Sequence, residues 1–295
     1  MQMGVGISCI QHPESGRERT YGSLPPTRVR KRVLVAGGGP AGMKAAAVAA
    51  ARGHRVVLCE AGAQLGGQVL LAQALPGRAE FGGLITNLAR EMDLAGVEVR
   101  LRQPVDAALV AAEAPEAVIL ATGAQPREAQ VEGRAEAHVL EAWQILRGEA
   151  NPGQRVVVAD WRSDWVGLGL AEKLAIDGCH VRLAVNGPHA GQELQMYLRD
   201  HWVGRLHKLG VEIIPYAQLY GVDSDTVYLR HSASGEAVIC EGADSLVLAQ
   251  GHSPDTRLEE ALSKFEGPCV LAGDCLAPRS AEQAVLEGLE AGLAV

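Results

Sequence analysis

One segment constrains the fold more than any other: the turn Gly37-Gly-Gly-Pro-Ala-Gly42, which lies between two β-branched apolar runs. The run 33–36 predicts a strand, the Ala-rich stretch to Arg52 predicts a helix, and the run 55–60 predicts a second strand ending at Glu60. A G-x-G-x-x-G turn in this context, followed about 20 residues later by an acidic residue, is the dinucleotide-binding fingerprint. We therefore expect a βαβ unit that binds a dinucleotide.

Each residue of the fingerprint has a separate physical role. Gly37 permits the tight turn, Gly39 lets backbone N–H groups approach a pyrophosphate, and Gly42 lets the helix lie close to the strand. The helix N-terminus adds a partial positive charge. Glu60 can accept hydrogen bonds from a ribose 2′-hydroxyl but repels a 2′-phosphate, which favours FAD, NAD or ADP over NADP.

The same pattern begins again after the breaker Asn151-Pro-Gly153, so the chain contains a diverged internal repeat. We predict an α/β fold of two Rossmann-like dinucleotide-binding units, the second inserted into the first. Residues 1–30, polar and rich in Pro and Arg, are expected to form a linker or docking arm. Residues 31–150 and 242–295 should form the FAD- or ADP-binding domain, and 151–241 the inserted NAD(P)-binding-like domain.

Other elements follow from hydrophobic periodicity. An amphipathic helix is expected over 81–95, a helical connection over 137–146 and a closing helix from about Ser280. The run 244–250 is expected to be a strand that returns to the first domain.

The second unit has lost the glycines of its phosphate loop. Superposing its first strand on that of the first unit places Asp160, Arg162 and Trp165 opposite the three glycines. Negative charge and bulky side chains at these positions oppose a pyrophosphate. Gly167, further along, is better interpreted as a helix-packing position. NAD(P) is therefore not expected at the second site.

Composition excludes several classes of function. The net charge of -8 and an aromatic content of 4% argue against nucleic acid and anionic membranes as partners. No apolar run approaches the roughly 20 residues that a bilayer requires, and we find no secretion signal. The six cysteines occur singly, without C-x-x-C, which favours a reducing cytoplasm. Because no triad or metal cluster is evident, no catalytic residue is assigned.

Four segments together resemble a known family: 33–42, Leu65-Gly-Gly-Gln68, Ala121-Thr-Gly123 and 273–279. They are similar, in order, to the C-terminal region of the trimethylamine dehydrogenase and 2,4-dienoyl-CoA reductase branch of the old-yellow-enzyme-like flavoproteins. The resemblance implies a layout with an N-terminal FMN-binding (β/α)8 barrel, a four-cysteine segment that holds a [4Fe–4S] cluster, and a region like this chain that binds FAD or ADP.

The resemblance also implies roles for residues outside the glycine turn. Gly67 and Gln68 would line the approach to the cofactor, and Asp274 would bind its ribityl chain or ribose. The full set of expected cofactor-binding residues is Gly37, Gly39, Pro40, Ala41, Gly42, Glu60, Ala61, Gly67, Gln68, Ala121, Thr122, Gly123, Gly273 and Asp274.

The chain departs from the family because the barrel is absent and only the last cluster cysteine is matched, by Cys9. A cluster held by thiolates needs its other ligands from elsewhere. Three alternatives stay open: a separately encoded subunit that completes a [4Fe–4S] cluster against an FMN-barrel partner, a fragment of a longer chain, or a vestigial Cys9.

The favoured hypothesis is an electron-transfer subunit of a flavin-dependent oxidoreductase. It would carry FAD or ADP and act with an FMN-barrel catalytic subunit in the oxidation or demethylation of N-methylated amines. An electron-transfer flavoprotein is the expected further partner. One alternative is a self-sufficient NAD(P)H-dependent FAD reductase. Another is a redox-silent nucleotide-binding scaffold.

Overall fold

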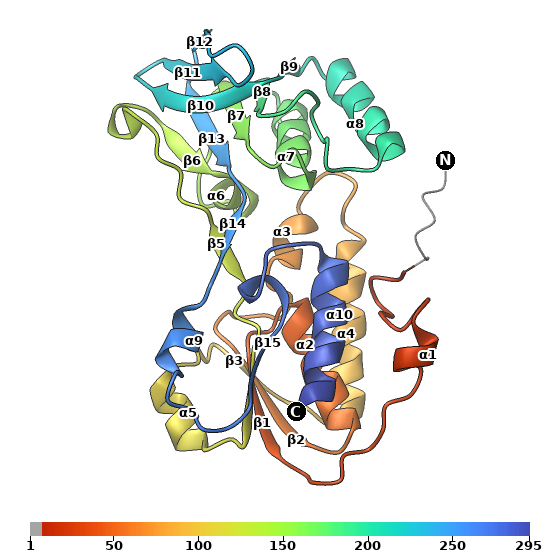
Figure 1. Cartoon of the computed structure of the whole chain (residues 1–295). Helices are drawn as coiled ribbons and strands as arrows, with labels where there is room; N and C mark the ends of the chain where they lie inside the picture. Colours follow the sequence, from red (N-terminus) through yellow and green to blue (C-terminus); the bar gives the residue numbers. More distant parts are fainter. Residues whose placement is uncertain (1–7) are drawn as a thin grey trace. The chain divides into compact units, whose positions relative to one another are not determined.

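Two five-stranded parallel sheets organise the chain, each in its own compact unit (Figure 1). The computed structural model describes residues 8–295. Of the described residues, the first unit contains 8–70 together with Glu80–Gln125 and Ser253–Val295, and the second contains Leu71–Ala79 and Pro126–His252. This arrangement of parallel sheets confirms the α/β class with Rossmann-like units.

The sheet of the first unit has the order β15-β4-β1-β2-β3. Its central strands are apolar and β-branched because both faces are covered, as parallel sheets require; all four residues of β4 are buried. The strands are β1 (Arg32–Ala36), β2 (Arg55–Glu60), β3 (Glu98–Leu101), β4 (Ala117–Leu120) and β15 (Cys269–Leu271).

In the first unit, the helix α2 (Pro40–Ala51) packs against both α4 (Phe81–Ala95) and α10 (Ala281–Ala294) (Figure 1). Two glycines, one turn apart on α10, allow it to approach α2 closely. A Cβ atom on Gly288 would lie 2.4 Å from the carbonyl oxygen of Ala41, and one on Gly292 would lie 2.8 Å from that of Ala45. The short helices of this unit are α1 (Glu18–Tyr21), α5 (Ala107–Glu113), α9 (Arg257–Ala261) and the 3-10 turn η2 (Gly273–Cys275).

The described part of the N-terminal arm runs along the first unit. The Glu14 carboxylate lies 3.5 Å from the ammonium of Lys44, a buried residue of α2, and Tyr21 donates a 2.6 Å hydrogen bond to Glu290 of α10. Arg17 forms an ion pair with Glu282. These contacts give the segment from residue 8 to 30 the character of a docked arm.

The sheet of the second unit has the order β6-β13-β7-β8-β9. Its strands are β6 (Val139–Glu141), β13 (Ser245–Ala249), β7 (Arg155–Asp160), β8 (His180–Val185) and β9 (Glu212–Ile214). A three-stranded antiparallel sheet contains β10 (Ala217–Val222), β11 (Thr226–His231) and β12 (Ala237–Glu241). The helical elements are η1 (Arg134–Glu136), α6 (Ala142–Leu146), α7 (Trp165–Ile176) and α8 (Met196–Lys208).

The unit boundaries differ from those expected. The run 244–250 contributes β13 to the second sheet, where it pairs with β7 and β6, and does not return to the first domain. The expected helix over 137–146 is instead the strand β6 followed by the five-residue helix α6. Residues 126–150 and 242–252 therefore belong to the second unit, because their strands complete its sheet.

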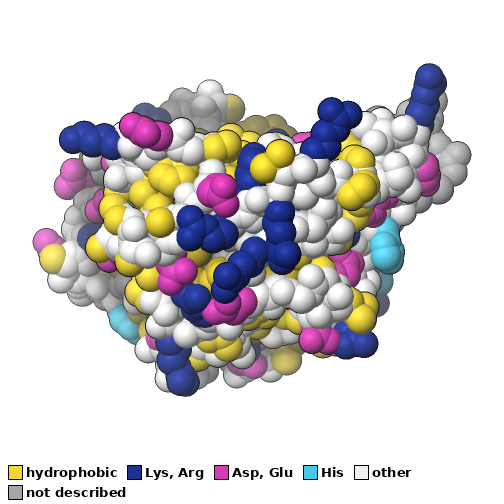
Figure 2. All heavy atoms as spheres, turned by 90° about the horizontal axis from the view of Figure 1, so that it is seen from below, with side chains coloured by type: hydrophobic (Ala, Val, Ile, Leu, Met, Phe, Trp, Pro, Cys, Tyr) yellow, Lys and Arg dark blue, Asp and Glu magenta, His cyan; other side chains and the backbone are white. Residues whose placement is uncertain are grey.

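The remaining elements are α3 (Val69–Ala72) and the short strands β5 (Ala124–Pro126) and β14 (His252–Pro254), which pair with each other. On the face in Figure 2, Lys and Arg side chains gather with Asp and Glu side chains among them, so its charge is of mixed sign. None of the helices in residues 8–295 is long and apolar enough to cross a membrane.

Candidate dinucleotide site and its closed counterpart

The glycine turn of the first unit has a geometry that only glycine permits at two positions. Gly37 has φ +111°, and a Cβ atom there would lie 2.2 Å from the carbonyl oxygen of Ala121. A Cβ atom on Gly42 would lie 2.0 Å from the carbonyl oxygen of Gly37. The turn therefore brings β1, α2 and the end of β4 into direct backbone contact.

The N-terminus of α2 is open. Gly39 is its N-cap and Pro40 its first residue, and no side chain within residues 8–295 caps it. In that same part of the chain, apart from Gly39 and its two neighbours in sequence, no atom lies within 4 Å of where a Cβ atom on Gly39 would be. The first N–H groups of a helix attract anions. The residues present thus fit the pyrophosphate of FAD or ADP.

Glu60 lies at the end of β2, where backbone groups hold its carboxylate. Its two oxygens accept 2.6 Å hydrogen bonds from the N–H groups of Gly38 and Gly62. The side chain is therefore fixed beside the glycine turn, and Ala61 follows it in the exposed loop. This placement is the one from which a carboxylate can accept hydrogen bonds from ribose hydroxyls.

A second glycine loop meets the first one. A Cβ atom on Gly67, which has φ +54°, would lie 3.1 Å from the Cα atom of Gly39. The next residue, Gln68, donates a 2.8 Å hydrogen bond to the carboxylate of Asp274. The other oxygen of Asp274 accepts a hydrogen bond from the N–H of Arg279. Residues far apart in the sequence are thus held together on one edge of the unit.

The segment Ala121-Thr-Gly123 follows β4 on the same edge. Thr122 donates a 2.8 Å hydrogen bond to the carbonyl oxygen of Asp255, and Gly123 lies close to the side-chain nitrogen of Gln68. In the sheet order, β1 and β4 flank the point where the chain direction across the sheet reverses, which is where open α/β sheets bind ligands. The fourteen expected residues therefore lie along the edge of the first sheet at which its strands β1 and β4 end.

Sequence reasoning missed one participant in this arrangement. The carboxylate of Glu287, on α10, accepts a 2.8 Å hydrogen bond from the N–H of Gly273 and pairs with Arg279. Gly273 has φ +76°, so it precedes Asp274 in a left-handed turn that Glu287 holds in place. In the sequence, Glu287 is an acidic residue on the helix that follows the Gly-Asp pair, but its spacing from that pair did not identify it as a partner of Gly273.

Cys9 does not lie in a metal centre formed by residues 8–295. Its thiol is half-buried and free. Within the described sequence there is no group of three or more His, Cys, Asp or Glu residues that could hold a metal ion. The residues present do not fit a [4Fe–4S] cluster, which needs further thiolates.

The corresponding turn in the second unit has four residues, 161–164, and is therefore one residue longer than the turn 37–39 of the first. Because of this insertion, Gly167, the third residue of α7, is the counterpart of Gly42, the third residue of α2. The prediction that Trp165 takes the place of the third glycine is therefore corrected. A Cβ atom on Gly167 would lie 2.1 Å from a carboxylate oxygen of Asp160.

The N-terminus of α7 is closed by the chain's own carboxylates. Asp164 is the N-cap and accepts a 3.0 Å hydrogen bond from the N–H of Val166. Arg162 lies 3.0 Å from the other oxygen of Asp164. Asp160 accepts a 2.9 Å hydrogen bond from the N–H of Ser163. The groups that would bind a pyrophosphate are already engaged, and the Asp164 carboxylate would repel it.

Asp160 is 2% exposed, and burial raises the pKa of its carboxyl to about 8, with the nearby Asp164 charge acting in the same direction. The group is therefore protonated in the folded protein at neutral pH. A raised pKa means that the folded state holds a proton that the unfolded state releases above pH 3.8, so stability falls as pH rises toward 8.

We expect Asp160→Asn to remove this loss of stability. The difference in free energy of unfolding, variant minus wild type, should increase by about 1.4 kcal/mol for each unit by which the pH is raised. Between roughly pH 5 and pH 7 the increase is about 3 kcal/mol. Urea unfolding at both pH values measures it. Asp177→Asn, at the exposed end of α7, is the control. A difference that stays constant with pH would contradict the burial of a neutral Asp160.

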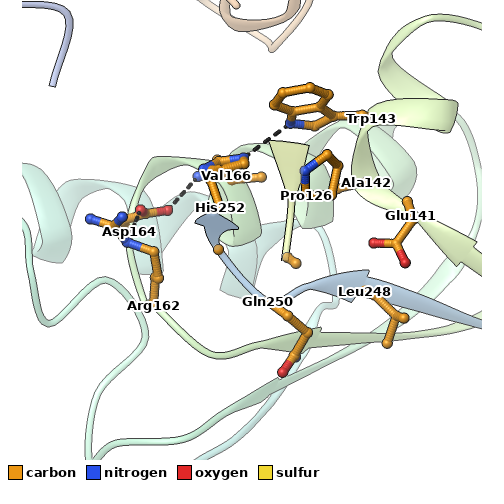
Figure 3. A pocket seen from close by; sticks show the side chains of 12 residues that line it. Pro126, Glu141, Ala142, Trp143, Arg162, Asp164, Val166, Leu248, Gln250 and His252 are labelled. Carbon is orange, nitrogen blue, oxygen red and sulfur yellow. Dashed lines mark hydrogen bonds and ion pairs between the residues drawn. The ribbon is translucent and has the colours of Figure 1, made fainter. Parts of the chain in front are cut away.

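The enclosed space beside this turn is small. Figure 3 shows Trp143 and His252, whose ring nitrogens form a 3.1 Å hydrogen bond, at a cavity that Arg162, Asp164 and Glu141 also line. Its volume is about 10 Å³, the room of about one water molecule. Burial raises the pKa of Glu141. This cavity has no room for a nucleotide.

The comparisons with known proteins give one family and several relatives. The family model described as pyridine nucleotide-disulphide oxidoreductase matches residues 31–267. The probable N-methylproline demethylase of Rhizobium meliloti is 38% identical over 89% of this chain and 39% of that protein. The NADH oxidase of Thermoanaerobacter brockii is 36% identical over 70% of this chain and 32% of that protein.

Among solved structures, a 2-naphthoyl-CoA reductase complex matches with a TM-score of 0.90 and 28% identity, over 98% of this chain and 43% of that one. These findings confirm the resemblance inferred from the four sequence segments. The chain spans between 32% and 47% of the length of four curated relatives that it matches.

Proposed function

Because the chain belongs to the pyridine nucleotide-disulphide oxidoreductase family, we propose that it is the FAD-binding, electron-transferring part of a flavin-dependent oxidoreductase. One observation carries the proposal: the α2 N-terminus is open and flanked by glycine, whereas the α7 N-terminus is capped by Asp164. The chain then holds one dinucleotide, in the first unit, and receives its electrons from a source other than NAD(P)H.

FAD, when bound, supplies the ring that accepts and releases electrons. The chain's own residues bind and orient it. Gly39 and the first turn of α2 would hold the pyrophosphate, Glu60 would accept hydrogen bonds from the ribose, and Asp274, fixed by Gln68, would bind the ribityl chain. No side chain of this chain is assigned to catalysis on the substrate.

The substrate chemistry is proposed to lie on an FMN-barrel partner, which is either a separate subunit or a further part of a longer protein. The relatives named as a demethylase of N-methylproline and a dehydrogenase of dimethylglycine and sarcosine support an N-methylated amine as the substrate class. An electron-transfer flavoprotein is the proposed acceptor, and Cys9 would join a [4Fe–4S] cluster only if the partner supplied the other ligands.

A second candidate is an NAD(P)H-dependent FAD reductase, because one relative is named an NADH oxidase. It requires a pyridine nucleotide at the second unit, where Asp160 and Asp164 already accept hydrogen bonds from the N–H groups of the turn.

The first test is the identity of the bound nucleotide. We expect the purified chain, or the apoprotein after incubation with FAD and ADP together, to retain FAD in a ratio of about one per chain, since one fingerprint is open. Mass analysis of the released nucleotide and the absorption spectrum measure this. Retention of ADP in preference to FAD would replace the electron-transfer role by the redox-silent scaffold, and retention of neither would overturn the proposal.

A further inference from the structure

The second unit has a hollow of about 210 Å³ next to its closed phosphate turn. It lies where the segment after β5, the loop after β7, the end of β13 and strand β10 meet, and Trp161, Arg127, Gln130, Gln218 and Gln250 line it. In the sheet order, β13 and β7 flank the point where the chain direction across the sheet reverses. Ligands bind open α/β sheets at such points.

The lining of this hollow suits a flat ring. Trp161 is 38% exposed, although it follows a buried strand, so one large aromatic surface remains accessible at the hollow. The guanidinium of Arg127 lies 5.2 Å from the centre of that ring. Aromatic and guanidinium planes are the surfaces on which heterocyclic rings stack.

The amide side chains of the lining are fixed in orientation. Gln250 donates a 2.7 Å hydrogen bond to the carbonyl oxygen of Ala159, and Gln218 accepts a 2.7 Å hydrogen bond from Arg230. An amide presents a donor and an acceptor side by side, which matches a heterocycle edge that has both, as in the bidentate pairing of Gln with adenine. Groups that are already ordered lose less entropy when a ligand binds.

The size and charge of the site exclude a dinucleotide. Pockets that enclose drug-sized ligands have roughly 300–1,000 Å³, so about 210 Å³ holds one ring system. The place for a pyrophosphate beside it is filled by Asp160 and Asp164.

We propose that this hollow, the Trp161 site, binds a planar nitrogen heterocycle with a donor and an acceptor on one edge and without a diphosphate, of the purine or pyridine-amide type. The proposal rests on the closed second unit of the proposed function. The Trp161 site would bind such a ring whether or not the flavin is present.

Adenosine and nicotinamide are the two probes, each titrated into FAD-loaded protein so that the first unit is filled. Calorimetry measures the affinity, and the NMR signals of the indole N–H groups of the four tryptophans locate the binding site. At least one probe should bind with a Kd of roughly 0.1–1 mM, as a fragment-sized ligand does, and should shift the Trp161 signal alone. The probe that binds more tightly identifies the ring type.

Variants separate stacking from folding. Trp161→Ala should weaken binding by roughly 10- to 100-fold, the usual effect of losing one stacked ring, and Trp161→Phe should restore most of it. Tyr228→Ala, an exposed ring on β11 outside the hollow, is the matched control and should bind as the wild type does.

Two results would overturn the Trp161 site: no saturable binding of either probe in the millimolar range, or binding that Trp161→Ala leaves unchanged. NADH is the third titrant. Binding of NADH at least tenfold tighter than either probe would show that the phosphate place is open, which contradicts the proposed function as well. Probe binding in the expected range, together with NADH binding that is no tighter, supports both the Trp161 site and the proposed function.

Discussion

Gly39→Ala is expected to lower the affinity for FAD by roughly 100-fold, or about 3 kcal/mol, while leaving the fold of the apoprotein intact. A Cβ atom at this position meets no atom of residues 8–295 within 4 Å, and the backbone φ of −76° suits alanine. The methyl group would therefore disturb only the space in which the pyrophosphate approaches the N-terminus of α2.

Flavin fluorescence on titrating apoprotein measures the affinity, and thermal unfolding of the apoprotein measures the fold. Gly83→Ala, on α4, is the matched control because a Cβ atom there also has no described neighbour within 4 Å. Equal FAD affinity in the two variants would show that the cofactor does not lie against Gly39.

The second large effect concerns the core of the second unit. Glu172 is fully buried on α7, accepts a 2.7 Å hydrogen bond from the indole of Trp202 and pairs with Arg205. Glu172→Ala should lower the free energy of unfolding by about 3–5 kcal/mol, because it leaves the buried indole N–H unpaired and a cavity beside it. Glu172→Gln keeps the hydrogen bond and should lose less.

Chemical denaturation of the three proteins measures this effect, with Glu193→Ala, an exposed carboxylate of the same unit, as the control. If Glu172→Ala unfolded at the same denaturant concentration as Glu193→Ala, the buried pair would contribute nothing to the stability of α7 and α8.

Trp165 has its own neighbours in this core. The guanidinium of Arg78 lies 3.4 Å from the centre of its ring, and Trp202 lies 5.2 Å from it, tilted by 60°. Leu75 contacts Gly169 on the same helix. The segment 71–79 thus belongs to the second unit, although its sequence lies between elements of the first. No local pattern could predict this, since the contacts join residues about ninety positions apart.

The first βαβ unit was predictable because local rules agree there. The glycine spacing, the β-branched runs and Glu60 all point to the same turn, and the helix expected over 81–95 is α4. The Gly-Asp pair at 273–274 was placed by resemblance, and the structure brings Asp274 to Gln68.

The second unit was harder to predict for physical reasons. Strand β6 has three residues, too few for a period, and it is a strand because β13 offers a parallel edge. The position of β13 depends on its pairing with β7, which the sequence of 244–250 does not encode locally. The longer turn before α7 was hidden because the two turns were superposed from their strands alone.

The contrast between the two helix N-termini is the central claim, and an anaerobic titration of the FAD-loaded protein with NADH and NADPH tests it most directly. We predict that the flavin absorption stays unchanged with either reductant, because Asp160 and Asp164 occupy the place of the pyrophosphate. Rapid bleaching by NADH or NADPH would contradict the closed second site and make the chain a pyridine-nucleotide-dependent reductase.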